Sequence, residues 1–171
     1  MTTWPFIDVD DNYFYIQTDK DAPTNKLVAA PVADPKPANW KTIVEAKPEV
    51  LSASAVGGSI FCSYLKDAVN KVYQYDRTGK QIREIQLPGL GTASGFGGKQ
   101  DEKETYYVFT SYVNPATIYK MDLASGKTTV YKESKVEFKP ADFESKQVFY
   151  TSKDGTKIPM LITYTGPPQG G

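Results

Sequence analysis

The stretch that best indicates the fold is residues 59–80, which reads SIFCSYLKDAVNKVYQYDRTGK. It contains two short runs rich in aromatic and β-branched side chains, FCSY at 61–64 and VYQYD at 72–76, and then the turn sequence TGK at 78–80. Side chains of these kinds favour strands, and a Gly in the turn supplies the positive φ that a tight hairpin needs. The stretch therefore predicts short antiparallel strands joined by hairpins.

The same elements return further along the chain. FTSY at 109–112 follows FCSY by 48 residues, IYKMD at 118–122 follows VYQYD by 46 residues, and SGK at 125–127 repeats the turn. We interpret these matches as two copies of one structural unit, because self-similarity at a fixed spacing is typical of repeat architectures.

A more diverged copy precedes both, with FYIQT at 14–18, KLVAA at 26–30 and TIV at 42–44. In the middle copy we expect four strands, at residues 51–56, 59–65, 71–76 and 81–86. Units of four short strands that repeat every ~45 residues are typical of β-propeller blades. The predicted fold class is all-β, a partial β-propeller of about two and a half four-stranded blades.

Composition and charge exclude several classes of protein. The 171 residues include 20 basic and 20 acidic side chains, one Cys and no His. The balanced charge argues against nucleic-acid binding, which requires clustered Lys and Arg. The absence of His excludes a Ser-His or Cys-His pair and the usual zinc sites within this chain. No apolar run approaches the ~18 residues of a membrane span, and the first residues do not resemble a secretory signal.

Three motifs suggest chemistry only superficially. Cys62 lies in an apolar strand sequence, and we interpret it as a buried packing residue. Gly57, Gly58 and Ser59 resemble part of a nucleophile elbow, but a strand follows and no His can activate the serine. The Gly-rich run at 89–95 precedes a strand rather than a helix, so we interpret it as a connection between blades.

An acidic run, DVDDN at residues 8–12, matches the opening of a calcium loop. Tyr13 stands where such a loop requires Gly, and Asp19 stands where it requires Glu. We therefore interpret the run as an acidic turn before a strand. The segment KQDEKE at 99–104 is interpreted as a solvated hairpin tip.

Aromatic pairs recur at strand spacing and could form a stacking platform for a ligand. At this spacing they more often fill the space between sheets, and we expect core packing. The pairs are Phe14/Tyr15, Tyr73/Tyr75 and Tyr106/Tyr107.

The repeat pattern stops near Val136. Residues 136–140 are predicted to be a linker, followed by a hairpin with strands at 147–151 and 157–164 around an Asp-Gly turn. Pro159 cannot donate a backbone hydrogen bond, so its strand should lie at an edge or carry a bulge.

The run VFYTSKDGTKIPM at 148–160 resembles the prolyl oligopeptidase family of serine peptidases, which cleave short peptides after proline. FTSY at 109–112 and TDKDAPTN at 18–25 are similar to propeller segments of that family. The resemblance implies three parts: propeller blades over residues 1–135, a linker and the first hairpin of an α/β-hydrolase domain over 136–164, and a disordered tail over 165–171.

The resemblance implies a non-catalytic propeller portion that controls substrate access by size. We predict no catalytic, cofactor-binding or metal-binding residue in this chain, and no hydrolysis by the chain alone. The expected partners are short peptides in the intact parent, the remainder of the propeller and hydrolase domain, and further copies of the fragment, with no nucleic acid and no membrane. Two alternatives stay open: a stand-alone binding module, and a fragment of an oligopeptidase that cleaves after basic residues. We expect a soluble protein, cytoplasmic or periplasmic.

Overall fold

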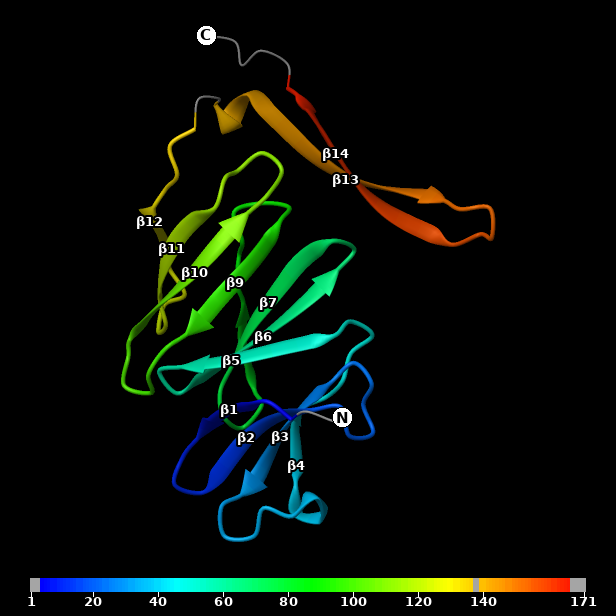
Figure 1. The fold of residues 1–171 in the computed structure, drawn as a ribbon. Helices are drawn as coiled ribbons and strands as arrows, with labels where there is room; N and C mark the ends of the chain where they lie inside the picture. Colours follow the sequence, from blue (N-terminus) through cyan, green and yellow to red (C-terminus); the bar gives the residue numbers. More distant parts are fainter. Residues whose placement is uncertain (1–3, 137–138, 167–171) are drawn as a thin grey trace.

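The computed structural model describes residues 4–136 and 139–166. These residues form three four-stranded antiparallel sheets and one two-stranded hairpin (Figure 1). Each sheet is a meander in which neighbours along the chain are neighbours in the sheet. The prediction of an all-β partial propeller built from four-stranded blades is confirmed.

The strands are short and follow one another closely along the chain. The first blade contains β1 (Phe6–Val9), β2 (Tyr13–Thr18), β3 (Lys26–Pro31) and β4 (Lys41–Val44). The second blade contains β5 (Leu51–Val56), β6 (Ser59–Lys66), β7 (Val69–Tyr75) and β8 (Gln81–Glu84). The third blade contains β9 (Thr92–Gly97), β10 (Glu104–Thr110), β11 (Thr117–Asp122) and β12 (Thr128–Lys132). The hairpin contains β13 (Phe143–Thr151) and β14 (Lys157–Thr165), and two 3-10 turns lie at Pro37–Asn39 and Pro140–Asp142.

The first blade is complete, so the described chain holds three blades, half a blade more than the repeats alone indicated. The additional strand is β1, which pairs with β2. It has only four residues, and its register shifts between Phe6 and Asp8. A strand this short and irregular has too little period-2 alternation to be recognised from the sequence.

The predicted turns are built as the sequence indicated. Asp76 accepts hydrogen bonds at Oδ1 from the backbone N–H of Thr78 (2.8 Å) and of Lys80 (3.0 Å), while Gly79 has a φ of +89°. In the third blade Asp122 accepts from the N–H of Ser125 at 2.7 Å. A carboxylate that bonds its own turn and a Gly at positive φ together determine these two hairpins.

Apolar side chains fill the spaces between blades in two clusters. Between the first and second blades lie Tyr15, Leu27, Ala29, Val44, Leu51, Ile60, Cys62, Tyr64 and Tyr75. Between the second and third lie Val56, Phe61, Val72, Ile85, Ala93, Phe96, Tyr107, Phe109, Met121 and Leu123. In β6 of the second blade, Ile60, Cys62 and Tyr64 therefore contact the first blade and Phe61 the third, as the two-residue period of a strand requires.

The match of FCSY with FTSY, 48 residues apart, does not join structurally equivalent positions. Cys62 pairs with Tyr73 across the second blade, and Tyr107 pairs with Tyr119 across the third. Since Tyr73 and Tyr119 are 46 residues apart, Cys62 corresponds to Tyr107, an offset of 45. The similar tetrapeptides are thus displaced by three residues, and part of FTSY lies beyond the end of β10.

The predicted hairpin after the blades is present and longer than expected. Its strands pair in continuous register from Phe143 with Thr165 to Thr151 with Lys157. Pro159 pairs with Phe149 without a bulge, because this sheet has only two strands and each strand is therefore an edge. Thr165 belongs to β14, and residues 167–171 of the predicted tail lie outside the described residues.

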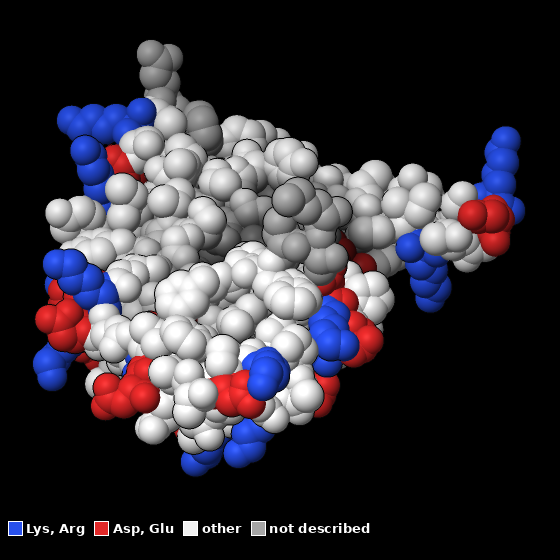
Figure 2. Space-filling model, turned by 60° about the horizontal axis from the view of Figure 1, so that its bottom comes forward, with Lys and Arg blue, Asp and Glu red and all other residues white. Residues whose placement is uncertain are grey.

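On the face of the molecule shown in Figure 2, basic and acidic side chains are interspersed around the edge, and the middle shows few charged residues. Among the described residues, no helix has the length and apolar character needed to cross a bilayer.

Candidate functional site

The hairpin lies across one end of the blades (Figure 1). In a meander, successive turns alternate between the two ends of the sheet. The β6–β7 turn and the β10–β11 loop lie at the end that faces the hairpin, which we call the hairpin-side face. The Gln147 side-chain amide donates a hydrogen bond to the Asp67 carbonyl of the β6–β7 turn. The hairpin thus rests on the second blade, although its chain emerges from the third.

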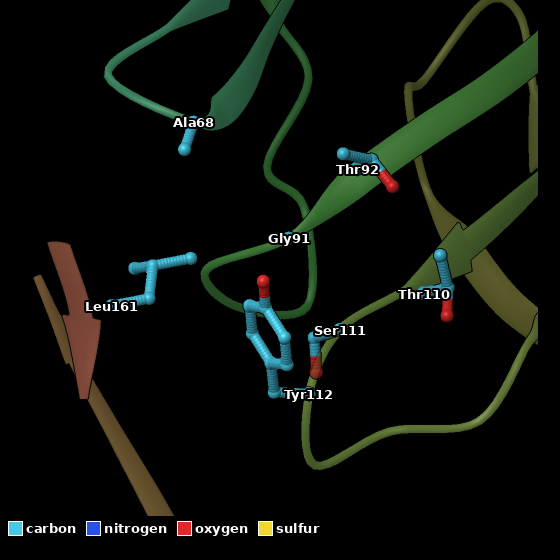
Figure 3. Close-up of a pocket in the computed structure, with 7 residues that line it drawn as sticks. All are labelled: Ala68, Gly91, Thr92, Thr110, Ser111, Tyr112 and Leu161. Carbon is cyan, nitrogen blue, oxygen red and sulfur yellow. The ribbon is translucent and has the colours of Figure 1, made fainter. Parts of the chain in front are cut away.

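A pocket of about 300 Å³ separates the hairpin from the blades (Figure 3). Leu161 of β14 faces it from the hairpin, and Tyr112 of the β10–β11 loop lies opposite. The Tyr112 side chain is 76% exposed, which is unusual for a large ring, and its neighbours in the pocket are small. The other lining residues are Ala68, Gly91, Thr92, Thr110 and Ser111. The pocket is therefore small and mostly apolar, with hydroxyl groups on the propeller side.

Local hydrogen bonds hold the loop that carries Tyr112. The Ser111 hydroxyl oxygen accepts from the backbone N–H of Val113 (3.2 Å) and of Asn114 (3.0 Å). Gly91 allows the entering chain to approach this loop, because a Cβ there would lie 2.3 Å from the Thr110 carbonyl oxygen. The exposed Tyr112 ring is thus presented by a locally ordered turn.

The β6–β7 turn beneath the hairpin has an unfavourable backbone conformation. Asp67 and Ala68 have φ values of +51° and +66°, the two positive values of a type I′ turn, at positions where Gly or Asn is usual. Each such residue costs of order 1 kcal/mol when it carries a Cβ. The Asp67 carbonyl also accepts the hydrogen bond from Gln147, so the hairpin contacts the second blade at this turn.

The structure places the two candidate nucleophiles in structural roles. Ser59 begins β6, and its hydroxyl oxygen accepts a hydrogen bond from Gln74 at 2.9 Å. Cys62 is fully buried between the first two blades, and burial raises the pKa of its thiol to about 12. A thiol with so high a pKa is protonated at neutral pH and is a poor nucleophile. That the whole chain contains no catalytic residue stays a prediction.

The acidic run at 8–12 is a turn in which the Asp10 carboxylate is already hydrogen-bonded. Asp10 Oδ1 accepts from the N–H of Asn12 (2.9 Å) and of Tyr13 (2.8 Å), and Oδ2 accepts from the Tyr15 hydroxyl at 2.7 Å. Burial raises the pKa of Asp10, but these hydrogen bonds outweigh it and bring the pKa below its ordinary value. Within residues 4–136 and 139–166, no three His, Cys, Asp or Glu side chains gather as they would around a metal ion.

Two of the three aromatic pairs, Phe14/Tyr15 and Tyr106/Tyr107, divide between the two faces of their strands, whereas Tyr73 packs against the same cluster as Tyr75. Tyr15, Tyr75 and Tyr107 are buried in the inter-blade clusters, as core packing predicts. Tyr106 points the other way, is 42% exposed, and contacts Tyr131 edge-on at 5.0 Å between ring centroids. Each pair of adjacent aromatics therefore supplies one ring to a core and one to the opposite face.

Comparison with known proteins identifies the family. Residues 3–134 match the family model described as the prolyl oligopeptidase N-terminal beta-propeller domain. This chain belongs to the prolyl oligopeptidase family. The matched region ends just after the third blade, so the blades and not the hairpin carry this match.

Individual relatives agree with this assignment. The chain is 48% identical over 157 residues to a prolyl endopeptidase of Elizabethkingia miricola. The match covers 92% of this chain and 22% of that protein. It is 30% identical to a dual function macrocyclase-peptidase of Galerina marginata, covering 86% of this chain and 21% of that protein. The chain therefore spans about a fifth of the length of the curated relatives that it matches.

Solved structures of the family have the same fold. Prolyl oligopeptidase B from Galerina marginata, without ligand, superposes with a TM-score of 0.85 at 25% identity, covering 96% of this chain and 24% of the other. The same enzyme has been solved with a 25-residue macrocyclization substrate, and this structure superposes with a TM-score of 0.80 at 25% identity over the same shares of the two chains.

Sequence reasoning missed the residues that join the hairpin to the blades. Gln147, Asp67 and Leu161 carry no motif, and their contacts connect positions up to 80 residues apart. Tyr112 was noticed only as the last residue of FTSY. The signal that could have placed Tyr112 in a loop is the run SYVNP at 111–115, whose Ser, Asn and Pro favour a turn directly after β10.

Proposed function

We propose that this chain is the non-catalytic propeller portion of a prolyl oligopeptidase-like serine peptidase that cleaves short peptides after proline. In this proposal the propeller controls by size which peptides reach the active site. The observation that carries it is the hairpin laid over the hairpin-side face. It continues the chain out of the third blade and covers the same end of the second.

The inner strands support the role of the blades in access. β5 and β9 are the first strands of the second and third blades, and side-chain hydrogen bonds link β5 to β9 and to β2 of the first blade. The Ser54 hydroxyl of β5 donates to the Phe96 carbonyl of β9 at 3.0 Å, and the Gln17 side chain of the first blade accepts from the N–H of Ala53 at 2.9 Å. These hydrogen bonds oppose the separation of neighbouring blades, and a filter that selects by size requires blades that stay together.

The chemistry in such an enzyme would come from outside this chain. A Ser-His-Asp triad with an oxyanion hole performs acyl transfer in serine peptidases, and this sequence has no His. The contribution of this chain is to limit access and to complete the chamber wall on the hairpin-side face, where Tyr112 and Leu161 face each other.

The test is a chimaera. The matching segment of the Elizabethkingia miricola prolyl endopeptidase is replaced by this chain, and the product is compared with the natural enzyme and with the chain alone. We expect the chimaera to cleave a short chromogenic peptide with proline before the scissile bond. It should leave intact a folded protein that carries the same sequence in a surface loop, and the chain alone should give no turnover.

A folded chimaera that cleaves the folded protein as readily as the peptide would refute the role in size selection. Turnover that purifies with the chain alone would refute the non-catalytic role. Circular dichroism of the chimaera ensures that a loss of turnover is not mistaken for a loss of folding.

We also propose that the isolated chain associates with itself. The third blade leaves Tyr106 and Tyr131 on the face that no other described blade covers, and their residues are 42% and 62% exposed. Apolar rings on an open sheet face favour association. Light scattering should show species larger than the 18.9 kDa monomer, and Tyr131→Lys should reduce them. A monomer at every concentration tested would contradict this proposal.

A further inference from the structure

Three polar side chains from three different blades meet at the rim opposite the hairpin-side face. Asp8 lies on β1, Arg77 in the β7–β8 turn and Gln100 in the β9–β10 turn. Arg77 Nη2 lies 2.6 Å from Asp8 Oδ2, and Gln100 Nε2 donates to Asp8 Oδ1 at 2.9 Å. The two oxygens of one carboxylate therefore bind one donor from the second blade and one from the third.

The ion pair is partly shielded from water. Side-chain exposure is 12% for Asp8 and 23% for Arg77. The guanidinium lies over the Tyr15 ring, 5.7 Å from its centroid, and Asp10 Oδ2 is 4.0 Å from Nη1. Ion pairs this buried are screened much less than surface pairs, and removal of one partner leaves a charge unpaired.

The β9–β10 turn reaches the first blade by passing over the second. The Lys99 carbonyl accepts from the N–H of Gly57 in the β5–β6 turn at 2.9 Å. Gly57 has a φ of +57°, and a Cβ there would lie 2.3 Å from the Glu102 carbonyl oxygen, so only Gly permits this approach. Gln100 then donates to Asp8 and also to the Val9 carbonyl. The segment 99–104 is exposed as predicted, but it also makes contacts that its composition did not indicate.

We propose that Asp8, Arg77 and Gln100 form a clasp that makes the three blades move as one body at this rim. Within residues 4–136, the hydrogen bonds that join the first blade to the third are both donated by Gln100, across 91 and 92 residues of sequence. Contacts between adjacent blades alone would let each pair open separately. A bond from the third blade to the first ties the opening of one pair to the opening of the other.

Hydrogen exchange measured by mass spectrometry on the whole chain tests the clasp. Gln100→Ala removes the bonds to the first blade and leaves the rest of the turn in place. We expect the amides of residues 6–9 to exchange about tenfold faster, because two lost hydrogen bonds at about 0.5–1.5 kcal/mol each correspond to a factor of that order. Asp101→Ala, one residue away in the same exposed turn, is the matched control and should leave residues 6–9 unchanged.

Arg77→Met provides a second readout. It should speed exchange at both residues 6–9 and residues 98–103, although it alters only the second blade. An increase confined to the altered turn in either variant would overturn the proposal, as would unchanged exchange at residues 6–9 in Gln100→Ala. If Arg77→Met does not fold, Gln100→Ala still tests the clasp. The Gln100 side chain is exposed, and its removal leaves no buried charge.

Discussion

Removal of the Phe96 ring should weaken the packing between the second and third blades and destabilise the protein. Phe96 is 2% exposed and lies in a row of stacked rings, 5.2 Å from Phe61 and 4.6 Å from Tyr107 between centroids. Truncation of a buried Phe to Ala costs about 3–5 kcal/mol, which includes the cavity left behind. We therefore expect Phe96→Ala to lose about 4 kcal/mol of unfolding free energy.

The backbone at Phe96 makes a second variant informative. Its φ is +59°, in the left-handed region where a Cβ costs roughly 1–2 kcal/mol. Phe96→Gly removes the ring and relieves this strain, so it should be about 1 kcal/mol less destabilised than Phe96→Ala. Glycine normally destabilises a strand relative to alanine, and the reversed order is specific to this conformation.

Urea titration with two probes measures both effects. With a slope of about 2 kcal/mol per M, a loss of 4 kcal/mol moves the midpoint by about 2 M. Circular dichroism reports all blades, whereas Trp4 and Trp40, 5.0 Å apart, report the first blade. If the blades unfold together, both probes shift equally, although the altered residue lies in the third blade.

The control is Phe6→Ala, because Phe6 is 60% exposed and should cost less than about 1 kcal/mol. A midpoint shift below about 0.5 M for Phe96→Ala would refute the conclusion that the stacked rings hold these blades together. A shift in circular dichroism without a shift in tryptophan fluorescence would refute cooperative unfolding of the three blades.

Three further predictions follow from local features. Ala68→Gly should stabilise the protein by about 1 kcal/mol in urea titration, because Ala68 has a φ of +66°. A loss of stability would contradict the conclusion that the backbone is strained at this residue. Cys62 should not react with a thiol reagent at pH 8 in the native state and should react fully in urea, because burial raises its pKa to about 12; native-state labelling at the unfolded rate would disprove its burial. Burial raises the pKa of Asp10, but hydrogen bonds lower it more, so the folded pKa lies below the ordinary 3.8 and the unfolded chain takes up the proton first as pH falls. The stability due to Asp10 is thus present above about pH 4 and lost below it, and the urea midpoint of Asp10→Asn should fall less steeply with acid than that of the natural chain.

The sequence predicted the existence of the strands much better than it predicted which positions are equivalent in different blades. The strands of the middle copy were placed within a few residues, because alternation of apolar side chains and the Thr-Gly turn at 78–79 are local signals. The alignment of FCSY with FTSY is wrong because FCSY begins at the third residue of β6 and FTSY at the sixth residue of β10, and similarity of four residues cannot detect this difference. Only the cross-strand pairs of Cys62 and Tyr107 reveal the true offset.

Polar contacts between blades could not be predicted from the sequence. Arg77 and Asp8 are 69 residues apart, and Gln100 and Asp8 are 92 apart. Each lies in or beside a turn where a charged or amide side chain is expected to be solvated. Their partners are determined by how the blades stack, which is a property of the whole fold and not of any one segment.

The hairpin is attached to the blades at two points that belong to different sheets. Its backbone leaves the third blade after β12, and Gln147 binds the Asp67 carbonyl of the second. A displacement of the hairpin therefore applies a torque between the second and third blades. The stacked rings of Phe61, Phe96 and Tyr107 lie between those two blades, so they are the part of the core that would bear this load. The rates at which these rings flip would then report on displacement of the hairpin, although the rings lie in the core between the blades.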